Sequence, residues 1–501
     1  MRDARPSLAV SLLLVGAVAV AFLVPAVVGC TLSGHDEPRV AGIAREMAMR
    51  RDLAVPRLDG KPFLEYPPLG YVGPALVCGL FPTAPEWALI LPSALFGIAT
   101  ALVTTWLGFQ IGGARLGITA GLLLVTMAGF FEVHHQLLVD PALVFFVTLA
   151  LACFHAGVVA ERWRWPAFAA AFLATGCAFL SKGLIGVAIP LAVSGAFLLL
   201  NRSAVRTLLG PILATAPLIA APLGVWVFAL YRENALDALH DVMSQSVHRF
   251  SSDAADHAHG PTYYLGPLAY RFAPWVLFPV AGLFLLRRVP AEERRAILRD
   301  ARFPAVWFGV VVFALHVASA KRTLYLAPLD PAVALLAAVA WSRIRLAKAI
   351  SPNVERGAFA LAGGILFGLY VFLVLPGERL ETYGPVVELA GTLRRDRPVL
   401  LHRPSEGLMG AFVYYLGETF PVARTPEELK RELAARGPCL VVSERGPGAV
   451  LPAPDELVPS LRRIGEDTVH RQTVSIYADE MASDDGATTL PHTVVPTPKR
   501  G

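Results

Sequence analysis

Long apolar runs alternate with short polar segments along most of the chain. Many runs approach 20 residues, the length that a helix needs to cross a bilayer core of roughly 30 Å. The pattern predicts an α-helical polytopic membrane protein with roughly eleven to thirteen spans. The predicted spans lie near residues 7–29, 86–108, 114–131, 137–159, 166–181, 183–200, 208–230, 265–286, 304–319, 323–341 and 356–375.

Some boundaries in this pattern admit more than one interpretation. The apolar segment 70–82 is short, so it could be re-entrant, interfacial or an additional span. Residues 27–30, with the sequence VVGC, look like a lipoprotein cleavage site. The preceding apolar run is longer than the core of a signal peptide, however, and we therefore interpret 7–29 as a retained first span.

Two polar segments, 31–70 and 231–264, are longer than the other connections. Within the first, apolar side chains recur with a helical period in the stretch 38–49. This predicts a short helix lying at the membrane surface, which Asp36 could cap.

The pattern changes after residue 380. The stretches RPVLLHR, PCLVVS and TVSIYA read as strands, and TPEELKRELAAR reads as a helix with Thr425 as its N-cap. We expect a small α/β domain over 380–480, after a multi-span domain over 1–376. Residues 481–501 have no periodicity and are predicted to be disordered.

Composition supports a membrane protein. Hydrophobic residues make up 55% of the chain and charged residues 17%, whereas soluble globular proteins carry roughly 25% charge. The net charge of +5 is small, and the basic residues lie mostly in short loops, which favours membrane orientation over nucleic-acid binding. The five cysteines show no metal-binding spacing.

Loop charge predicts the topology. With the N-terminus in the cytoplasm, each cytoplasmic loop is basic, as the positive-inside rule requires. An odd number of spans then places the C-terminal domain outside the cytoplasm, and we expect the bacterial inner (cell) membrane. The same topology places several polar groups on the outer face. They are the loops 31–70 and 231–264, Asp140, Lys182, and the Lys321–Arg322 pair.

Several motifs occur in order along this outer face. They are HDEPRVAGIAREM, LDGKPFLEYPPL, LLVDPALVFF, FLSKGLIG, the loop from HRF to PWVLFP, and SAKRTLYLAPLDP. The series resembles the lipid-dependent GT-C glycosyltransferases, in particular the branch of the lipid A aminoarabinose transferase and the related protein O-mannosyltransferases. The resemblance covers residues 30–340. Tyr66 stands where this family has a lysine, and Phe63 where it has a tyrosine.

The resemblance implies that a sugar moves from a polyprenyl-phosphate donor to a lipid (lipid A-like), glycan or protein acceptor, with inversion at the anomeric carbon. Such a reaction needs a carboxylate near the acceptor's nucleophile. Asp36 is the best candidate, with Glu37 orienting the acceptor. The alternative is that both belong only to the start of a helix.

Cations must stabilise the leaving phosphate. The donor-phosphate candidates are Arg249, Lys321, Arg322, Lys182 and Tyr325. Simple membrane anchoring is the alternative for the Lys321–Arg322 pair, a structural ion pair for Lys182, and a place in the aromatic belt for Tyr325.

Three further side chains carry donor atoms that suit a divalent metal such as zinc: Glu65, His248 and His259. The alternative is that these histidines are simply solvated. Glu65, Asp140 and His259 are also further candidate site residues on the outer face. No cofactor besides this metal ion is expected.

A second class of function, a multi-span secondary transporter, is compatible with the number of spans. Transporters usually bind substrate near the middle of the membrane, between repeated halves. In this chain the ionisable residues gather at one face and no internal repeat is visible. The sequence therefore favours the glycosyltransferase.

Overall fold

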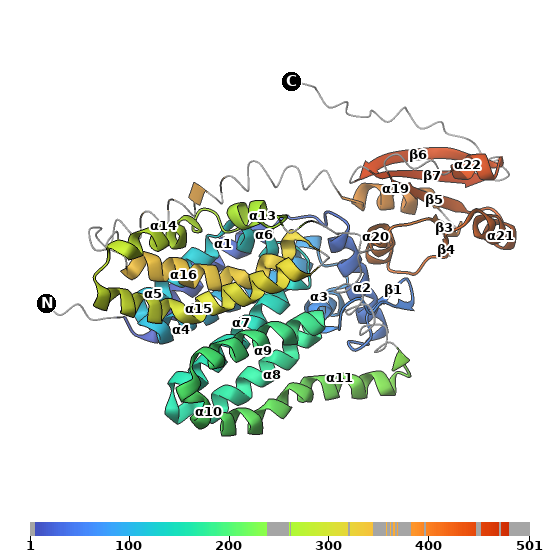
Figure 1. Cartoon of the computed structure of the whole chain (residues 1–501). Coiled ribbons are helices and arrows are strands. Elements are labelled where there is room, and N and C mark those ends of the chain that lie inside the picture. Colours follow the sequence, from blue (N-terminus) through green and yellow to red (C-terminus); the bar gives the residue numbers. More distant parts are fainter. Residues whose placement is uncertain are drawn as a thin grey trace.

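The computed structural model describes residues 6–237, 260, 262–318, 321–343, 382–394, 397–446, 452–469 and 472–479, with five single positions between 357 and 368. Long helices form an elongated bundle, and a small α/β domain sits at one end of it (Figure 1). The order along the chain matches the predicted order of a helical membrane part followed by an α/β part.

The first half of the bundle consists of α1 (Leu8–Val27), α3 (Leu69–Leu80), α4 (Glu86–Gly112), α5 (Ala114–Val125), α6 (Ala128–His134), α7 (Asp140–Val159), η1 (Glu161–Trp163), α8 (Arg164–Lys182) and α9 (Leu184–Leu200). Glycines at positive φ separate consecutive helices at two places. Gly113 (φ 83°) lies between α4 and α5, and Gly183 (φ 70°) lies between α8 and α9. This backbone conformation is costly for any residue with a Cβ atom, so glycine marks both breaks.

The second half contains α10 (Arg202–Thr215), η2 (Ala216–Ile219), α11 (Ala220–Arg232), α13 (Leu265–Arg271), α14 (Leu277–Leu285), η3 (Leu286–Arg288), α15 (Ala291–Val317), η4 (Thr323–Leu329) and α16 (Asp330–Arg343). Large apolar side chains point outward from these helices, among them Val225, Phe284 and Phe313. A bundle surface of this kind is suited to lipid rather than to water. The protein is an integral membrane protein.

Within the described residues, six helical segments are long and apolar enough to cross a membrane, or seven if a pair bent by 64° counts as one span. The bent pair is α5 and α6, in the region predicted as the single span 114–131. The predicted span 265–286 is likewise divided, into α13 and α14. The predicted span 356–375 and the tail 481–501 lie outside the described residues, apart from single positions.

One predicted boundary is wrong. The basic stretch before residue 304 was expected to be a loop, but α15 already begins at Ala291 and continues through it. Alanine, glutamate, arginine and leucine are strong helix formers, so the helix extends beyond its apolar part. Hydropathy indicates which part of a helix lies in the membrane and does not indicate where the helix starts.

The segment after α1 folds into α2 (Asp36–Arg50) and a short hairpin of β1 (Arg57–Leu58) and β2 (Lys61–Pro62). The helix predicted over 38–49 is therefore present as α2, and many of its residues are buried. Its place at the membrane surface stays a prediction. Asp59 and Gly60 form the hairpin turn, and both have positive φ, as the two-residue turns that suit hairpins require. The Gly60 N–H donates to the buried carboxylate of Glu46, which attaches the hairpin to α2.

The C-terminal domain contains α19 (Gly384–Arg394), β3 (Val399–His402), α20 (Glu406–Leu416), β4 (Val422–Ala423), α21 (Pro426–Arg436), β5 (Leu440–Arg445), α22 (Pro454–Leu457), β6 (Leu461–Val469) and β7 (Gln472–Asp479). The strand order is β4-β3-β5-β7-β6; β3 pairs in parallel with β4 and β5, and β7 is antiparallel to β5 and β6. The three predicted strands are β3, β5 and β7. The predicted capping box on α21, between Thr425 and Glu428, is also present.

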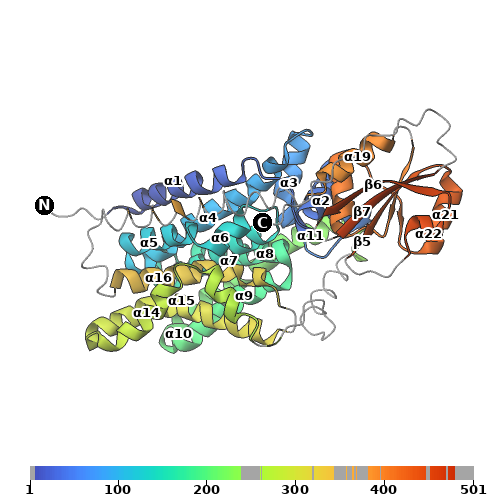
Figure 2. The ribbon, with the colours of Figure 1, turned by 90° about the horizontal axis from the view of Figure 1, so that it is seen from above.

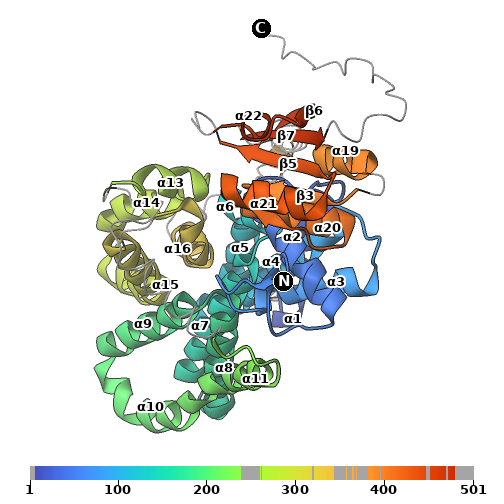
Figure 3. The ribbon, with the colours of Figure 1, turned by 90° about the vertical axis from the view of Figure 1, so that its right-hand side faces the viewer.

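This domain rests on the end of the bundle formed by α2 and α3. Figures 1 and 3 show α20 beside α2, and Figure 2 shows the sheet at the end of the bundle away from the N-terminus. Among the hydrogen bonds that join the parts here, the Phe420 N–H donates to the Asp59 carboxylate at 2.8 Å, and the Tyr414 hydroxyl donates to the Ala84 carbonyl at 3.4 Å. Polar residues from distant parts of the chain therefore meet at this end.

Candidate functional site

A cavity of about 410 Å³ opens at this end of the bundle. It is lined by residues 33–37 and 321–324 together with Glu132, Gln136, Leu138, Tyr263 and Arg271. Four of the predicted site residues share this lining: Asp36, Glu37, Lys321 and Arg322. The volume lies in the usual range for a small-ligand pocket.

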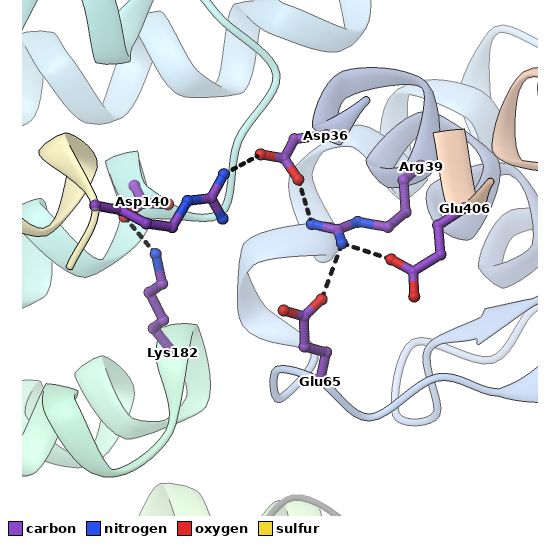
Figure 4. A network of polar contacts seen from close by, with 7 residues as sticks. Asp36, Arg39, Glu65, Asp140, Lys182 and Glu406 are labelled. Atoms are coloured by element: carbon purple, nitrogen blue, oxygen red, sulfur yellow. Dashed lines mark hydrogen bonds and ion pairs between the residues drawn. The ribbon is translucent and has the colours of Figure 1, made fainter. Parts of the chain in front are cut away.

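Asp36 is held between two guanidinium groups. One carboxylate oxygen lies 2.7 Å from Nη2 of Arg39, and the other lies 3.1 Å from Nη2 of Arg322 (Figure 4). Burial by itself would raise the pKa of the Asp36 carboxyl, but Arg39, Arg322 and Lys182 outweigh burial and hold the pKa below its usual value. Asp36 is therefore ionised at neutral pH, with a side chain that is 29% exposed.

The expectation that Asp36 caps the surface helix is wrong. His35 occupies the N-cap position, without a side-chain capping bond, and Asp36 is the first helical residue. The Asp36 carboxylate is directed toward the arginines instead. This leaves its charge at the cavity, where it can act on a ligand.

Arg39 is the centre of the network. Its Nη1 lies 3.0 Å from the carboxylate of Glu65 and 2.7 Å from that of Glu406, which comes from the C-terminal domain (Figure 4). Burial would lower the pKa of the Arg39 guanidinium, but Glu65 and Asp36 raise it overall. Arg39 thus carries a permanent charge that three carboxylates share.

Glu37 is directed away from this network and is buried. Its carboxylate accepts the N–H groups of Ser33 at 2.7 Å and Leu137 at 2.6 Å, and the Ser33 hydroxyl at 3.0 Å. Burial raises the pKa of Glu37 to about 7, although the two amides oppose this. Glu37 joins the segment after α1 to the segment before α7, which suits a residue that positions the cavity wall.

Lys182 and Asp140 form a buried pair next to the network. The ammonium lies 2.6 Å from the carboxylate, and the two side chains are 8% and 4% exposed. The rings of Tyr66 and Tyr325 lie 5.2 Å and 5.6 Å from the same ammonium, within cation–π distance. Tyr66, at the position where the family that the motifs resemble has a lysine, therefore packs against Lys182.

Lys321 lies in the cavity wall, but its ammonium also contacts the C-terminal carbonyls of α15. It approaches the carbonyls of His316 at 3.3 Å and Leu315 at 3.5 Å, and it contacts that of Ala318. A cation at this place is favourable because the C-terminus of a helix carries partial negative charge. Lys321 therefore stabilises the end of α15 as well as contributing charge to the cavity.

Arg271 is a cavity residue that the sequence did not indicate. It is fully buried, and its Nε and Nη2 donate to both oxygens of Asp330 at 3.1 Å and 2.8 Å. Its Nη1 lies 3.9 Å from Glu132. A Cβ on Gly129 would lie 2.0 Å from the Arg271 side chain, so the glycine provides the space for it. A single arginine in an apolar stretch carries no motif by which to find it.

The candidates Arg249, His248 and His259 lie outside the described residues. The third member of the proposed metal set, Glu65, is paired with Arg39. Across the described part of the chain, no three His, Cys, Asp or Glu side chains are grouped as metal ligands. The divalent metal stays a prediction from the sequence.

Comparison with known proteins places this geometry in context. Residues 65–227 match the family model of the dolichyl-phosphate-mannose-protein mannosyltransferases. A structure of ArnT from Cupriavidus metallidurans bound to undecaprenyl phosphate superposes with a TM-score of 0.72 at 20% identity, covering 93% of this chain and 97% of that one. The chain has the GT-C fold. An oligosaccharyltransferase from Archaeoglobus fulgidus superposes with a TM-score of 0.56 at 12% identity, covering 87% of this chain and 69% of that one.

Curated relatives confirm the resemblance seen in the motifs. The undecaprenyl phosphate-alpha-4-amino-4-deoxy-L-arabinose arabinosyl transferase of Yersinia enterocolitica is 27% identical over 70% of this chain. The match spans 63% of the length of that relative, and 60% of the length of the one from Yersinia pestis. This GT-C protein therefore resembles the lipid A aminoarabinose transferases.

Proposed function

We propose that this GT-C protein is a glycosyltransferase that moves a sugar from a polyprenyl phosphate to a lipid, glycan or protein acceptor. The observation that supports this most is the ionised Asp36 carboxylate in the wall of a cavity, flanked by Arg322 and Lys321. The similarity to aminoarabinose transferases favours undecaprenyl phosphate as the carrier and a lipid A-like acceptor.

In the proposed reaction, Asp36 accepts the proton of an acceptor hydroxyl. The acceptor oxygen forms a bond to the anomeric carbon from the side opposite the phosphate. The bond between that carbon and the phosphate oxygen breaks, and its electron pair leaves on the polyprenyl phosphate. General-base assistance of this kind typically contributes about 10²–10⁴-fold to the rate.

Arg322 is placed to act on both Asp36 and the phosphate of the donor. Its guanidinium contacts Asp36, and its side chain is 36% exposed at the cavity. As the donor bond breaks, negative charge develops on the phosphate, and a fixed cation stabilises that charge. The Lys182 ammonium, between its two tyrosine rings, adds a second positive field near Asp36.

The transporter alternative has less support. The described cavity lies at one end of the bundle, beside the α/β domain. The matching family model is that of mannosyltransferases, and the curated relatives are arabinosyl transferases. We further propose that this end faces outward from the inner membrane. A phosphatase fused after residue 479 should then be active in the periplasm, and activity of a cytoplasmic reporter at that site would contradict the orientation.

The function is tested by mass spectrometry of envelope lipids and glycans from a knockout strain. The strain is complemented either with the parent gene or with the Asp36→Asn variant. We expect one sugar-modified species to disappear in the knockout and to return only with the parent. Identical lipid and glycan profiles in all strains would contradict a glycosyltransferase.

A further inference from the structure

The C-terminal domain faces α2 with α20 and, next to His35, with one edge of its sheet. The strands β3, β4 and β5 are parallel, so their carboxyl ends share one edge. In open α/β sheets, ligands typically bind outside the carboxyl ends of the strands. In this protein the N-terminus of α20, which directly follows β3, lies at that edge and packs against α2 (Figure 3).

The helices α2 and α20 approach until their backbones touch. A Cβ on Gly42 would lie 2.5 Å from the Cα of Gly410, and a Cβ on Gly410 would lie 2.3 Å from the Pro38 carbonyl oxygen. A larger residue at either glycine would therefore separate the two helices. So close a contact fixes the distance between the domain and α2.

Two polar contacts at this interface flank Asp36. On one side, Glu406 of α20 binds Arg39, whose other nitrogen binds Asp36; both distances are 2.7 Å. On the other side, the Tyr383 hydroxyl lies 3.2 Å from Nδ1 of His35, the residue before Asp36.

The contact of Tyr383 with His35 is connected to further hydrogen bonds inside the C-terminal domain. The Tyr383 hydroxyl donates to the buried carboxylate of Glu444 at 2.9 Å, and Glu444 also accepts the Ser405 N–H at 2.6 Å. Since Tyr383 uses its own proton there, it can accept one from His35. Ser405 in turn caps α20, the helix that carries Glu406.

We propose that the C-terminal domain completes the active site, with Glu406 as a positioning residue that acts on Asp36 through Arg39, and with Tyr383 holding His35. This rests on the proposed function of Asp36. The domain then uses the ligand-binding edge of its sheet to hold the helix that begins with the catalytic carboxylate.

The charge of Glu406 has a predictable effect. Arg39 is shared by Asp36, Glu65 and Glu406, so its field at Asp36 is partly cancelled. Without the Glu406 charge, the Arg39 field at Asp36 becomes stronger and Asp36 becomes a weaker base. The acid limb of the pH–rate curve should move down by about 0.5–1 pH unit, the size expected for one charge at this range.

The test compares Glu406→Gln with Glu427→Gln in the full-length protein in lipid nanodiscs. Glu427 is an exposed acid in the first turn of α21, so the control removes the same charge from an equivalent helix position. Hydrogen exchange of residues 36–50 is measured first. We expect about two- to fivefold faster exchange at the start of α2 in Glu406→Gln and in Tyr383→Phe, and parent values in the control.

The second measurement is sugar transfer from a polyprenyl-phosphate donor as a function of pH. A downward shift of the acid limb in Glu406→Gln alone supports the proposal. The proposal is overturned if hydrogen exchange in both Glu406→Gln and Tyr383→Phe equals that of the parent. It is also overturned if exchange becomes faster but the acid limb of the pH–rate curve of Glu406→Gln does not move. If the parent transfers no sugar from any such donor, the proposed function fails, and hydrogen exchange still decides whether the domain holds α2.

Discussion

The network around Asp36 and the pair of Lys182 with Asp140 are neighbouring charge clusters with different surroundings (Figure 4). Asp36 lies in the wall of the cavity, partly exposed, and two arginines share it. Lys182 and Asp140 are almost fully buried, with tyrosine rings beside the ammonium. The first cluster can reach a ligand, whereas the second is enclosed by protein.

This difference separates two uses of charge. A group that exchanges a proton with a substrate needs access to it, which Asp36 has. A buried ion pair mainly satisfies itself, because each charge would be very costly without its partner. The two clusters are still coupled, since the Lys182 ammonium contributes to the lowered pKa of Asp36.

The largest effect is expected for Asp36→Asn, which keeps the size of the side chain and removes the base. We expect turnover to fall by about 10²–10⁴-fold. The melting temperature should change little, because ion pairs of partly exposed groups contribute about 0–1 kcal/mol. Turnover and thermal unfolding are measured on the same preparations.

Asp52→Asn is the matched control for this variant. Asp52 also accepts an arginine contact of 2.7 Å, from Arg57, and it is not part of the cavity lining. Its turnover should stay within about twofold of the parent, given that general-base effects are far larger. An Asp36→Asn protein that turns over like the parent would remove Asp36 from the chemistry.

Substitutions in the buried pair of Lys182 and Asp140 should instead change mainly the stability of the protein. Lys182→Met leaves the Asp140 carboxylate buried without its cation, which typically costs about 3–5 kcal/mol. Adding Asp140→Leu removes the stranded charge, so the double variant should recover most of the loss in thermal unfolding. A double variant no more stable than the single one would show that burial of the lone charge is not the cause.

The sequence indicated those residues of the candidate site that lie within local motifs. Asp36, Lys321 and Arg322 each stand in a recognisable stretch, and the structure brings them to one cavity. Arg271 could not be found in this way, because its position depends on Gly129 and Asp330 from other helices. Glu406 could not be found either.

The same distinction holds for the fold. Apolar runs located the helices of the bundle, and the capping box at Thr425 located α21, because both signals are local. The docking of α20 on α2 depends on Gly42 and Gly410, which are far apart in sequence and carry no individual signal. The start of α15 was missed because the helix continues beyond the apolar stretch.

Glu37 is adjacent to Asp36 in the sequence, but its pKa is shifted in the opposite direction. Burial raises the pKa of Glu37 from 4.5 to about 7, while the cations around Asp36 lower that of its carboxyl. A raised pKa means that the folded protein binds the proton more tightly than the unfolded chain. The stability that this provides is complete below pH 4.5 and is lost as the pH rises through about 7.

The smallest effect is therefore expected in the pH dependence of stability, measured by thermal unfolding from pH 4.5 to pH 8 for the parent and for Glu37→Gln. Glutamine stays neutral, so the variant should lack this component, and the parent should lose up to about 3 kcal/mol relative to it across the range. The curves of Asp36→Asn and the parent should stay parallel over this range, since the stability that the lowered pKa of Asp36 adds is already present above pH 3.8 and is lost only as the pH falls further. Parallel curves for the parent and Glu37→Gln would show that the amides of Ser33 and Leu137 keep Glu37 ionised despite its burial.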